Sequence, residues 1–186
     1  MAIAREISAE HIAPAGSTLA FEPQRRYNWT LEVTPPESIA DTHTFTEVIR
    51  LSIVSMPFPQ MEVGRVTINF GNEQRHVAGR ATFSEEQLTC VDYIDRETFR
   101  ILYDWYTRVY NPETGEIGYA FEYKGTADVL FFGPKGLASE QYIRTWRLHG
   151  IWPRVLRPGE GDMNTDAPNQ VVVTFSVDRA VYSARR

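Results

Sequence analysis

The chain has 186 residues, a net charge of −5 and a hydrophobic share of 42%. One domain of this length can bury a core of its own, so the fold needs neither disulfides nor metal. The negative charge argues against binding along a phosphate backbone, which requires clustered lysine and arginine, and the single cysteine, Cys90, excludes an intrachain disulfide.

The first part of the chain has no regular hydrophobic pattern, and prolines such as Pro14 and Pro23 interrupt any helix or strand there. We therefore expect an N-terminal arm over residues 1–24 and a single β domain over residues 25–186. No signal peptide and no apolar run of membrane-spanning length is visible, so we expect synthesis in the cytoplasm and no membrane contact.

The N-terminal half of the domain reads as a series of strands. Alternating apolar residues predict a strand at Tyr27–Val33, and a second is predicted at Phe45–Met56, where apolar residues fall on both faces. A third at Val63–Phe70 should turn at Gly71-Asn72 and return through Gln74–Arg80 as a hairpin, because both turn residues tolerate positive φ.

The next segment combines an interrupted strand and a helix. A strand is predicted at Ala81–Val91, with a bulge near Glu85 where the alternation changes phase. Apolar residues at helical spacing from Phe99 to Val109 predict a helix about three turns long, which Asp95 could cap.

Three further strands are predicted toward the C-terminus, at Tyr119–Phe132, Glu140–Trp152 and Val171–Val177. A turn at residues 133–136 joins the first two, and a loop rich in glycine, proline and aspartate covers residues 157–169. About seven strands and one helix indicate a mainly β fold, an antiparallel β-sandwich or barrel with one α-helix packed against it.

The sequence lacks the local signatures of catalytic sites. There is no GxSxG elbow, no HExxH pair and no GxxxxGK[ST] loop, and the four histidines are scattered. The paired carboxylates lie on opposite faces of a strand, at the expected helix start or in a loop: Glu85 with Glu86, Asp92 with Asp95, and Glu160 with Asp162. We therefore expect no catalytic residues, no cofactor and no metal site, and a protein that is not an enzyme.

From Leu88 onward the chain reads LTCVDYID, FRILYDWYTRVYNPETGEIG, YKGTADVLFF, RTWRLHGIWP and VVVTFSVDRAVY. This order resembles the tail tube proteins of contractile-tailed bacteriophages, which share a fold with the Hcp-like tube proteins of secretion systems. The residues that carry the resemblance are Trp105, Asn111, Pro112, Thr114, Gly115, Tyr123, Lys124, Gly150, Trp152, Pro153 and Asp178.

The resemblance implies a structural virion protein. Hexameric rings would join their inner sheets into one barrel and stack into the inner tube of the tail, assembled in the bacterial host cytoplasm as the conduit for DNA ejection. The implied partners are further copies of the chain, the tail sheath protein, the baseplate tube-initiation protein, the tail terminator and a tape measure protein in the lumen. DNA would pass through without specific binding, and the negative charge of the chain would suit an acidic lumen that repels phosphate.

The resemblance also suggests where rings meet. Residues 61–80 are the candidate stacking hairpin, with Arg65, Asn69, Asn72, Arg75, His76 and Arg80 as inter-ring candidates. The lumen residues stay open. Polar members of the predicted strands are candidates only: Glu122, Asp128, Thr145, Arg147, Thr174 and Ser176.

Three other functions remain compatible with the sequence. The chain could form the tube of a contractile injection or type VI-like secretion system that carries protein. A monomeric β-barrel would instead hold a small ligand in an aromatic cavity. An enzyme would show a cleft containing carboxylates or histidines with shifted pKa values.

Overall fold

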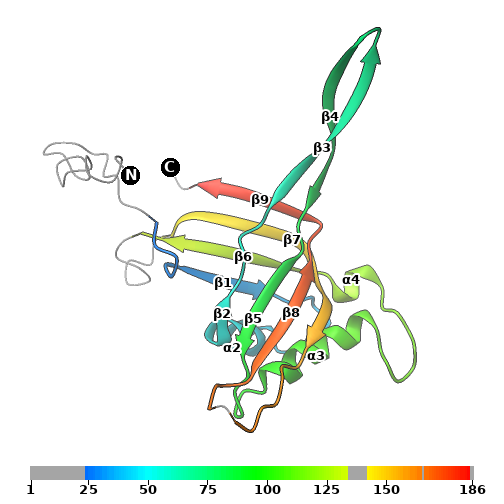
Figure 1. Ribbon diagram of the computed structural model, residues 1–186. Coiled ribbons are helices and arrows are strands. Elements are labelled where there is room, and N and C mark those ends of the chain that lie inside the picture. The colour runs from blue at the N-terminus through cyan, green and yellow to red at the C-terminus, as the bar shows by residue number, and fades with distance from the viewer. Residues whose placement is uncertain (1–23, 134–141, 165, 185–186) are drawn as a thin grey trace, which may run out of the picture.

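The computed structural model describes residues 24–133, 142–164 and 166–184 (Figure 1). The predicted arm at residues 1–24 lies outside these ranges apart from its last residue, and the predicted turn at residues 133–136 lies outside them apart from its first. The division into an arm and a domain therefore stays a prediction.

The described part of the chain is mainly β, as predicted, but it contains nine strands and three helices instead of about seven and one. The strands are β1 (Trp29–Thr34), β2 (Ile53–Ser55), β3 (Met61–Phe70), β4 (Glu73–Phe83), β5 (Glu86–Val91), β6 (Gly125–Phe132), β7 (Tyr142–Arg157), β8 (Gln170–Ser176) and β9 (Arg179–Ala184). The helices are α2 (Thr42–Ser52), α3 (Thr98–Val109) and α4 (Ala120–Tyr123).

The strands form one curled antiparallel sheet and a separate hairpin (Figure 1). Strand β7 has 16 residues and takes part in both halves of the curled sheet. Its first part pairs with β6 and β9, and its last part pairs with β8. We call β1, β6, β7 and β9 sheet A, and β7, β8, β5 and β2 sheet B. Strands β3 and β4 pair only with each other among the described residues and project from the sheet as a long hairpin.

Strand β7 bends between the two sheets at Gly150, which has a φ of 64°. A Cβ atom at this position would collide with the side-chain carboxylate of Asp178. The same carboxylate accepts from Nζ of Lys124 at 2.5 Å, and the backbone N–H of Asp178 donates to the carbonyl of His149 at 3.2 Å. These contacts explain why glycine, lysine and aspartate stand at three of the positions that carry the family resemblance.

The core lies inside the curl of the sheet, with α2 packed on β1 and α3 packed on β7 and β8. It includes Leu88 and Val173 from sheet B, Val129 from sheet A and Leu102 from α3. Cys90 is buried in this core, and burial raises the pKa of its thiol to about 11. The thiol is therefore protonated at neutral pH and serves as packing mass.

The strand predicted at Phe45–Met56 is wrong over most of its length. Residues 42–52 form α2, and only residues 53–55 form a strand. The buried side chains of this segment recur at helical spacing: Phe45, Val48, Ile49 and Ser52. When the segment is read as a strand, the same spacing puts apolar residues on both of its faces, which explains the wrong prediction. Asp41 begins the helix, because its carboxylate accepts from the backbone N–H of Thr44 at 3.0 Å.

Other predicted boundaries also change. The predicted strand at Ala81–Val91 divides into the end of β4 and the whole of β5, since residues 84–85 pair in neither. The helix begins at Thr98, with Glu97 instead of Asp95 at its N-cap position. The start of the strand predicted at Tyr119–Phe132 is α4, and β6 begins only at Gly125.

Replacing Gly150 tests the bend in β7. Gly150→Ala combines an unfavourable φ with a collision at Asp178, so we expect it to lower the free energy of unfolding by about 3 kcal/mol. Gly115→Ala is the matched control, because Gly115 has a φ of 74° but a Cβ there would meet nothing within 4 Å. For this control a loss of about 1 kcal/mol is expected. Urea unfolding measures both. Equal losses would show that Asp178 does not require glycine here.

Candidate functional site

Sheet A has two outer edges that no described strand covers, although the Val33 carbonyl near the end of β1 accepts from the Thr46 hydroxyl of α2 at 2.7 Å. Strand β1 pairs with β6 on one side, and β9 pairs with β7 on one side. The other side of each strand presents backbone N–H and C=O groups without a neighbouring strand in the described part of the chain. Such edges can pair with a strand from another copy.

The face of sheet A that points away from the core is polar. Residues opposite each other across antiparallel strands share a face, so the pairing register gives its composition. One row across the sheet runs Glu32, Asp128, Arg147 and Val181. The next row runs Thr34, Thr126, His149 and Arg179, and a third runs Thr30, Leu130, Thr145 and Ser183. We call this surface the open face.

Charges on the open face balance. Nε and Nη2 of Arg147 donate to the two carboxylate oxygens of Asp128 at 2.8 and 2.9 Å. Glu32 adds a negative charge beside them, and Arg179 adds a positive charge in the next row. The expectation of an acidic lumen rested on the total charge of the chain, whereas the described residues of this face carry two acidic and two basic side chains.

Three of the six lumen candidates come together on the open face: Asp128, Thr145 and Arg147. Thr174 and Ser176 lie on the outer face of sheet B, and Glu122 lies on α4, where its carboxylate accepts from the backbone N–H of Tyr119 at 2.9 Å. Sequence patterns did not identify the remaining members of the open face. Their positions opposite Asp128 and its neighbours depend on strand order, which alternation does not encode.

The hairpin of β3 and β4 has one apolar and one polar face. Val66, Ile68, Phe70 and Val77 lie on one face and are all exposed. The guanidinium of Arg75 lies on the same face, 4.7 Å above the ring of Phe70. An exposed apolar ribbon on a monomer indicates a contact surface.

The six inter-ring candidates are all exposed on this hairpin. Arg65, Asn69 and His76 lie on its polar face, where His76 is 3.2 Å from the hydroxyl of Thr67. Arg75 lies on the apolar face, Asn72 lies in the turn, and Arg80 lies opposite Gly64, where the register shifts. The inter-ring candidates are all polar and stay a prediction; the apolar face, which the alternation of Val66, Ile68 and Phe70 already indicated, is a further exposed surface of the hairpin.

A buried carboxyl group lies at the root of the hairpin. Glu86 is 1% exposed, and one of its oxygens accepts from the hydroxyl of Ser84 at 2.6 Å. Ser84 also holds Gln60, because the Ser84 N–H donates to the Gln60 carbonyl at 3.1 Å and the Gln60 N–H donates to the Ser84 hydroxyl at 3.0 Å. The second oxygen of Glu86 has no partner among the described residues, and burial raises the pKa of this carboxyl.

The residues of the family resemblance hold the junction of helix and sheet. Trp105 is fully buried, and its Nε1 donates to the carbonyl of Tyr123 at 2.7 Å. Its ring packs at 5.4 Å from Phe45 and 5.3 Å from Phe175. The others occupy the turn after α3 and the bend of β7: Asn111, Pro112, Thr114, Gly115, Trp152 and Pro153.

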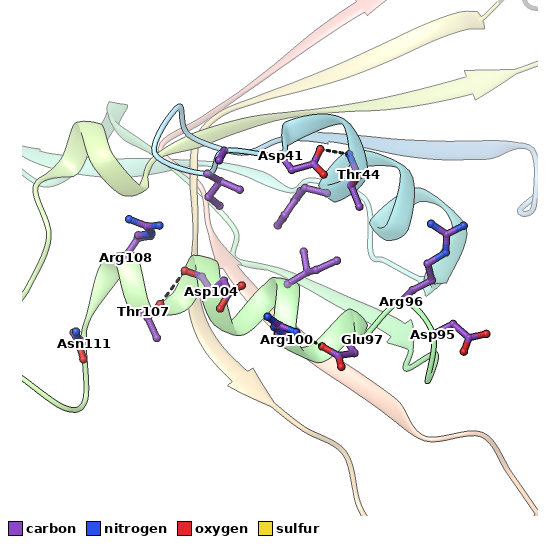
Figure 2. A pocket seen from close by; sticks show the side chains of 14 residues that line it. Asp41, Thr44, Asp95, Arg96, Glu97, Arg100, Asp104, Thr107, Arg108 and Asn111 are labelled. Atoms are coloured by element: carbon purple, nitrogen blue, oxygen red, sulfur yellow. Dashed lines mark hydrogen bonds and ion pairs between the residues drawn. The ribbon is translucent and has the colours of Figure 1, made fainter.

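A groove of about 910 Å³ runs between α2 and α3 (Figure 2). Its walls are mainly charged, with Asp41 on one side and Glu97, Arg100 and Arg108 on the other. Hydrogen bonding to Thr44 lowers the pKa of Asp41. This lining differs from the aromatic cavity expected of a ligand-binding barrel. Over the described ranges no three His, Cys, Asp or Glu residues approach closely enough to hold a metal ion.

Among the residues described, no helix has both the length and the apolar character needed to cross a membrane. No family model matches the sequence, and no curated protein matches it.

Several solved structures are similar in fold. A chain in the cryo-EM structure of the anti-feeding prophage cap, the AFP tube terminating cap, aligns with a TM-score of 0.68 over 93% of this chain and 99% of its own at 11% identity. A chain of the PVC sheath–tube complex, from an extracellular contractile injection system, aligns with a TM-score of 0.67 over 96% of this chain and 99% of its own at 14% identity. A chain of the 6-fold symmetrised AFP baseplate aligns with a TM-score of 0.65 over 88% of this chain and 97% of its own at 9% identity. The chain thus has the fold of tube proteins of contractile injection systems, as the resemblance implied.

Truncating Trp105 tests the junction of α3 and the sheet. Trp105→Ala should lower the free energy of unfolding by about 3–5 kcal/mol, because it removes a buried ring that several elements share. Trp105→Phe keeps part of the ring and should cost less. Urea unfolding of both variants gives the values. A loss below about 1 kcal/mol for alanine would contradict this role.

The pKa of Glu86 predicts a pH dependence. A carboxyl pKa raised by folding means that the folded chain binds more protons, so stability falls as pH rises above the ordinary value of 4.5. Glu86→Gln removes this dependence, and its stability relative to the unmodified chain should increase between pH 4 and pH 8. Urea unfolding across that range measures the difference. A constant difference would mean that Glu86 does not titrate in this way.

Proposed function

We propose that this chain is the structural subunit of the inner tube of a contractile tail or injection apparatus. Copies form hexameric rings, and the rings stack into a hollow tube. The observation that carries the proposal is sheet A, which has two unpaired edges, a core-covered side and a polar open face. The role is structural, and no catalysis is part of it.

Ring closure follows from the difference between the two edges. The edge of β1 in one copy can pair with the edge of β9 in the next, which is a heterologous contact that closes when the rotation fits a ring. Because α2 packs on the core side of β1, the open face is the side that remains for the lumen. The 6-fold symmetrised baseplate among the similar structures supports six copies per ring.

Stacking is assigned to the hairpin of β3 and β4, which extends far from the sheet (Figure 1). Its apolar face would be covered by the neighbouring ring, and its polar face would give the contact specificity. The similar structures named for a sheath–tube complex, a tube cap and a baseplate support a sheath protein, a terminator and a tube-initiation protein as partners. A tape measure protein in the lumen is the remaining proposed partner.

Two cargoes fit such a conduit. In a phage tail, the tube would carry DNA during ejection and would be part of the virion. In an injection or secretion system it would carry protein, and the names of the similar structures support this alternative. The balanced charge of the open face suits either cargo, because it offers no excess of positive charge to hold phosphate. A neighbouring sheath gene together with a capsid gene would distinguish the phage.

Negative-stain microscopy of the purified chain, with and without a tube-initiating partner, tests the proposal. Hexagonal rings or uniform hollow tubes are expected. A chain that stays monomeric under all conditions would contradict the proposed function.

Changes in the hairpin should separate ring formation from stacking. Replacing Arg65, Arg75 and Arg80 with Glu, or Ile68 with Asp, should leave the fold and the rings intact and abolish tubes, because the hairpin surface lies outside the core. The matched control is Glu160→Arg in the loop before β8, at a distance in sequence from the hairpin. Tubes of normal length from the hairpin variants would show that another segment stacks the rings.

A further inference from the structure

Two surfaces at opposite ends of sheet A carry opposite charge. Residues 110–122, between α3 and β6, contain Glu113, Glu116 and Glu122 but no lysine or arginine. We call them the glutamate loop. At the other end, where β1 and β7 begin and β6 and β9 end, lie Arg25, Arg26 and Arg144. No acidic residue occurs in the described segments at this end, which are residues 24–29, 56–60, 130–133, 142–146 and 182–184. We call this surface the arginine end.

The two surfaces are far apart on one chain (Figure 1). The glutamate loop leads into the first residue of β6, and the arginine end contains its last residue, so about 25 Å of strand separates them at roughly 3.3 Å per residue. One copy therefore cannot bring them together. A pair of complementary surfaces on opposite ends of one molecule is suited to a head-to-tail contact between copies.

The glutamate loop presents large apolar side chains. Ile117, Tyr119 and Phe121 are 77%, 73% and 78% exposed, and the rings of Tyr119 and Phe121 stack at 5.8 Å. Scattered exposed apolar residues are ordinary, but three within five residues form a patch of the kind that partners cover.

Hydrogen bonds hold this loop in one conformation. The N–H of Gly115 donates to the carbonyl of Asn111 at 2.8 Å, and the N–H of Asn111 donates to the carbonyl of Glu116 at 3.0 Å. The N–H of Gly118 donates to the carbonyl of Val109 at 3.1 Å, and Glu122 holds the N–H of Tyr119. A preorganised apolar patch loses little conformational entropy when it binds.

The arginine end presents aromatic rings on the core side of sheet A. Trp29, Phe131 and Arg144 form one row across the strands, and Trp146 and Tyr182 lie in the next. Phe58 covers part of the surface, with its ring 4.8 Å from Phe131 and 6.1 Å from Trp29. Phe58 and Tyr182 are nevertheless 42% and 48% exposed.

Two arginines at this end have no ionic partner among the described residues, although Nε of the partly exposed Arg144 is buried. The guanidinium of Arg144 lies 4.5 Å above the ring of Phe131, and neither it nor Arg26 forms a hydrogen bond or ion pair with any described residue. Arginine and aromatic side chains are the residue types that most often contribute strongly to the binding free energy of protein interfaces, and here they lie side by side.

We propose that the glutamate loop of one copy docks on the arginine end of a second copy. The contact would place the three glutamates against Arg26 and Arg144, and the stacked rings of the loop against Trp146 and Tyr182. It would cover the exposed apolar side chains of both surfaces. The pair would still have one free glutamate loop and one free arginine end, so further copies could add in the same orientation. The inference rests on the proposed function, since it names a contact between copies of the tube.

Two double variants test the contact. The loop variant combines Glu113→Lys with Phe121→Ser, and the end variant combines Arg26→Glu with Tyr182→Ser. The control, Glu160→Lys with Met163→Ser, makes the same kinds of change in the loop before β8. Urea unfolding checks that each variant folds, and sedimentation velocity over a concentration series measures association.

Each double variant should need at least about tenfold more protein than the unmodified chain to reach the same associated fraction, which corresponds to about 1.4 kcal/mol per contact. The control should associate normally. A 1:1 mixture of the loop and end variants should form pairs, because one intact loop then meets one intact end. Normal association of either variant, or a mixture no more associated than its components, would overturn the proposal.

Two further outcomes are distinguishable. If the unmodified chain never forms rings or tubes, the proposed function fails. If it forms them and the loop variant does so equally well, only this contact fails. A third possibility is that the arginine end binds nucleic acid, and the fluorescence anisotropy of a short labelled DNA duplex measures this binding. If the end variant loses duplex binding and assembles normally, the arginine end is a nucleic-acid surface and the proposal is overturned.

Discussion

Strand β7 belongs to two sheets, and the arrangement of the other elements depends on how it passes from one to the other. It pairs with β9 up to His149 and with β6 up to Ile151, and from Trp152 onward it pairs with β8. The bend requires a residue with positive φ and no side chain, since the Asp178 carboxylate fills the space a Cβ would take. Lys124 pairs with that carboxylate and so connects the start of β6 to the turn between β8 and β9. Three distant parts of the sequence thus meet at one point of the fold.

This bend determines which surfaces remain for other copies. It turns sheet B and the two longer helices toward one side of sheet A, so that one face of sheet A is covered and the other stays polar and open. It also leaves β1 and β9 as edges without a described neighbour. The hairpin leaves the sheet through the contacts of Gln60, Ser84 and Glu86, which fix its root. In the proposed tube, the open face would line the lumen, the two edges would join neighbouring copies and the hairpin would stack the rings.

Sequence patterns predicted the parts of this fold that depend on local chemistry. The hairpin was placed correctly because Gly71 and Asn72 tolerate the turn and the flanking residues alternate. Helix α3 followed from one apolar stripe. Helix α2 was mistaken for a strand. Its sequence has a wide apolar stripe and β-branched residues, and when it is read with the two-residue period of a strand, apolar residues fall on both faces. Boundaries near Glu86 and Tyr119 failed for a similar reason, since caps and short breaks leave little trace in hydrophobic periodicity.

The proposed assembly surfaces were harder to predict from the sequence. The open face joins residues of β1, β6, β7 and β9, so its members could be grouped only once strand order and register were known. The same holds for the arginine end, which collects Arg26, Arg144 and Tyr182 from three separate segments. The glutamate loop, in contrast, is contiguous, and its three glutamates and exposed rings are visible in the sequence once their exposure is known.

A cryo-EM reconstruction of assembled rings or tubes is the most direct test of the proposed assembly. We expect β1 of each copy to lie beside β9 of the next and the Asp128–Arg147 pair to face the lumen. A lumen lined by sheet B or by the helices, or copies joined without pairing of these two strands, would contradict this arrangement.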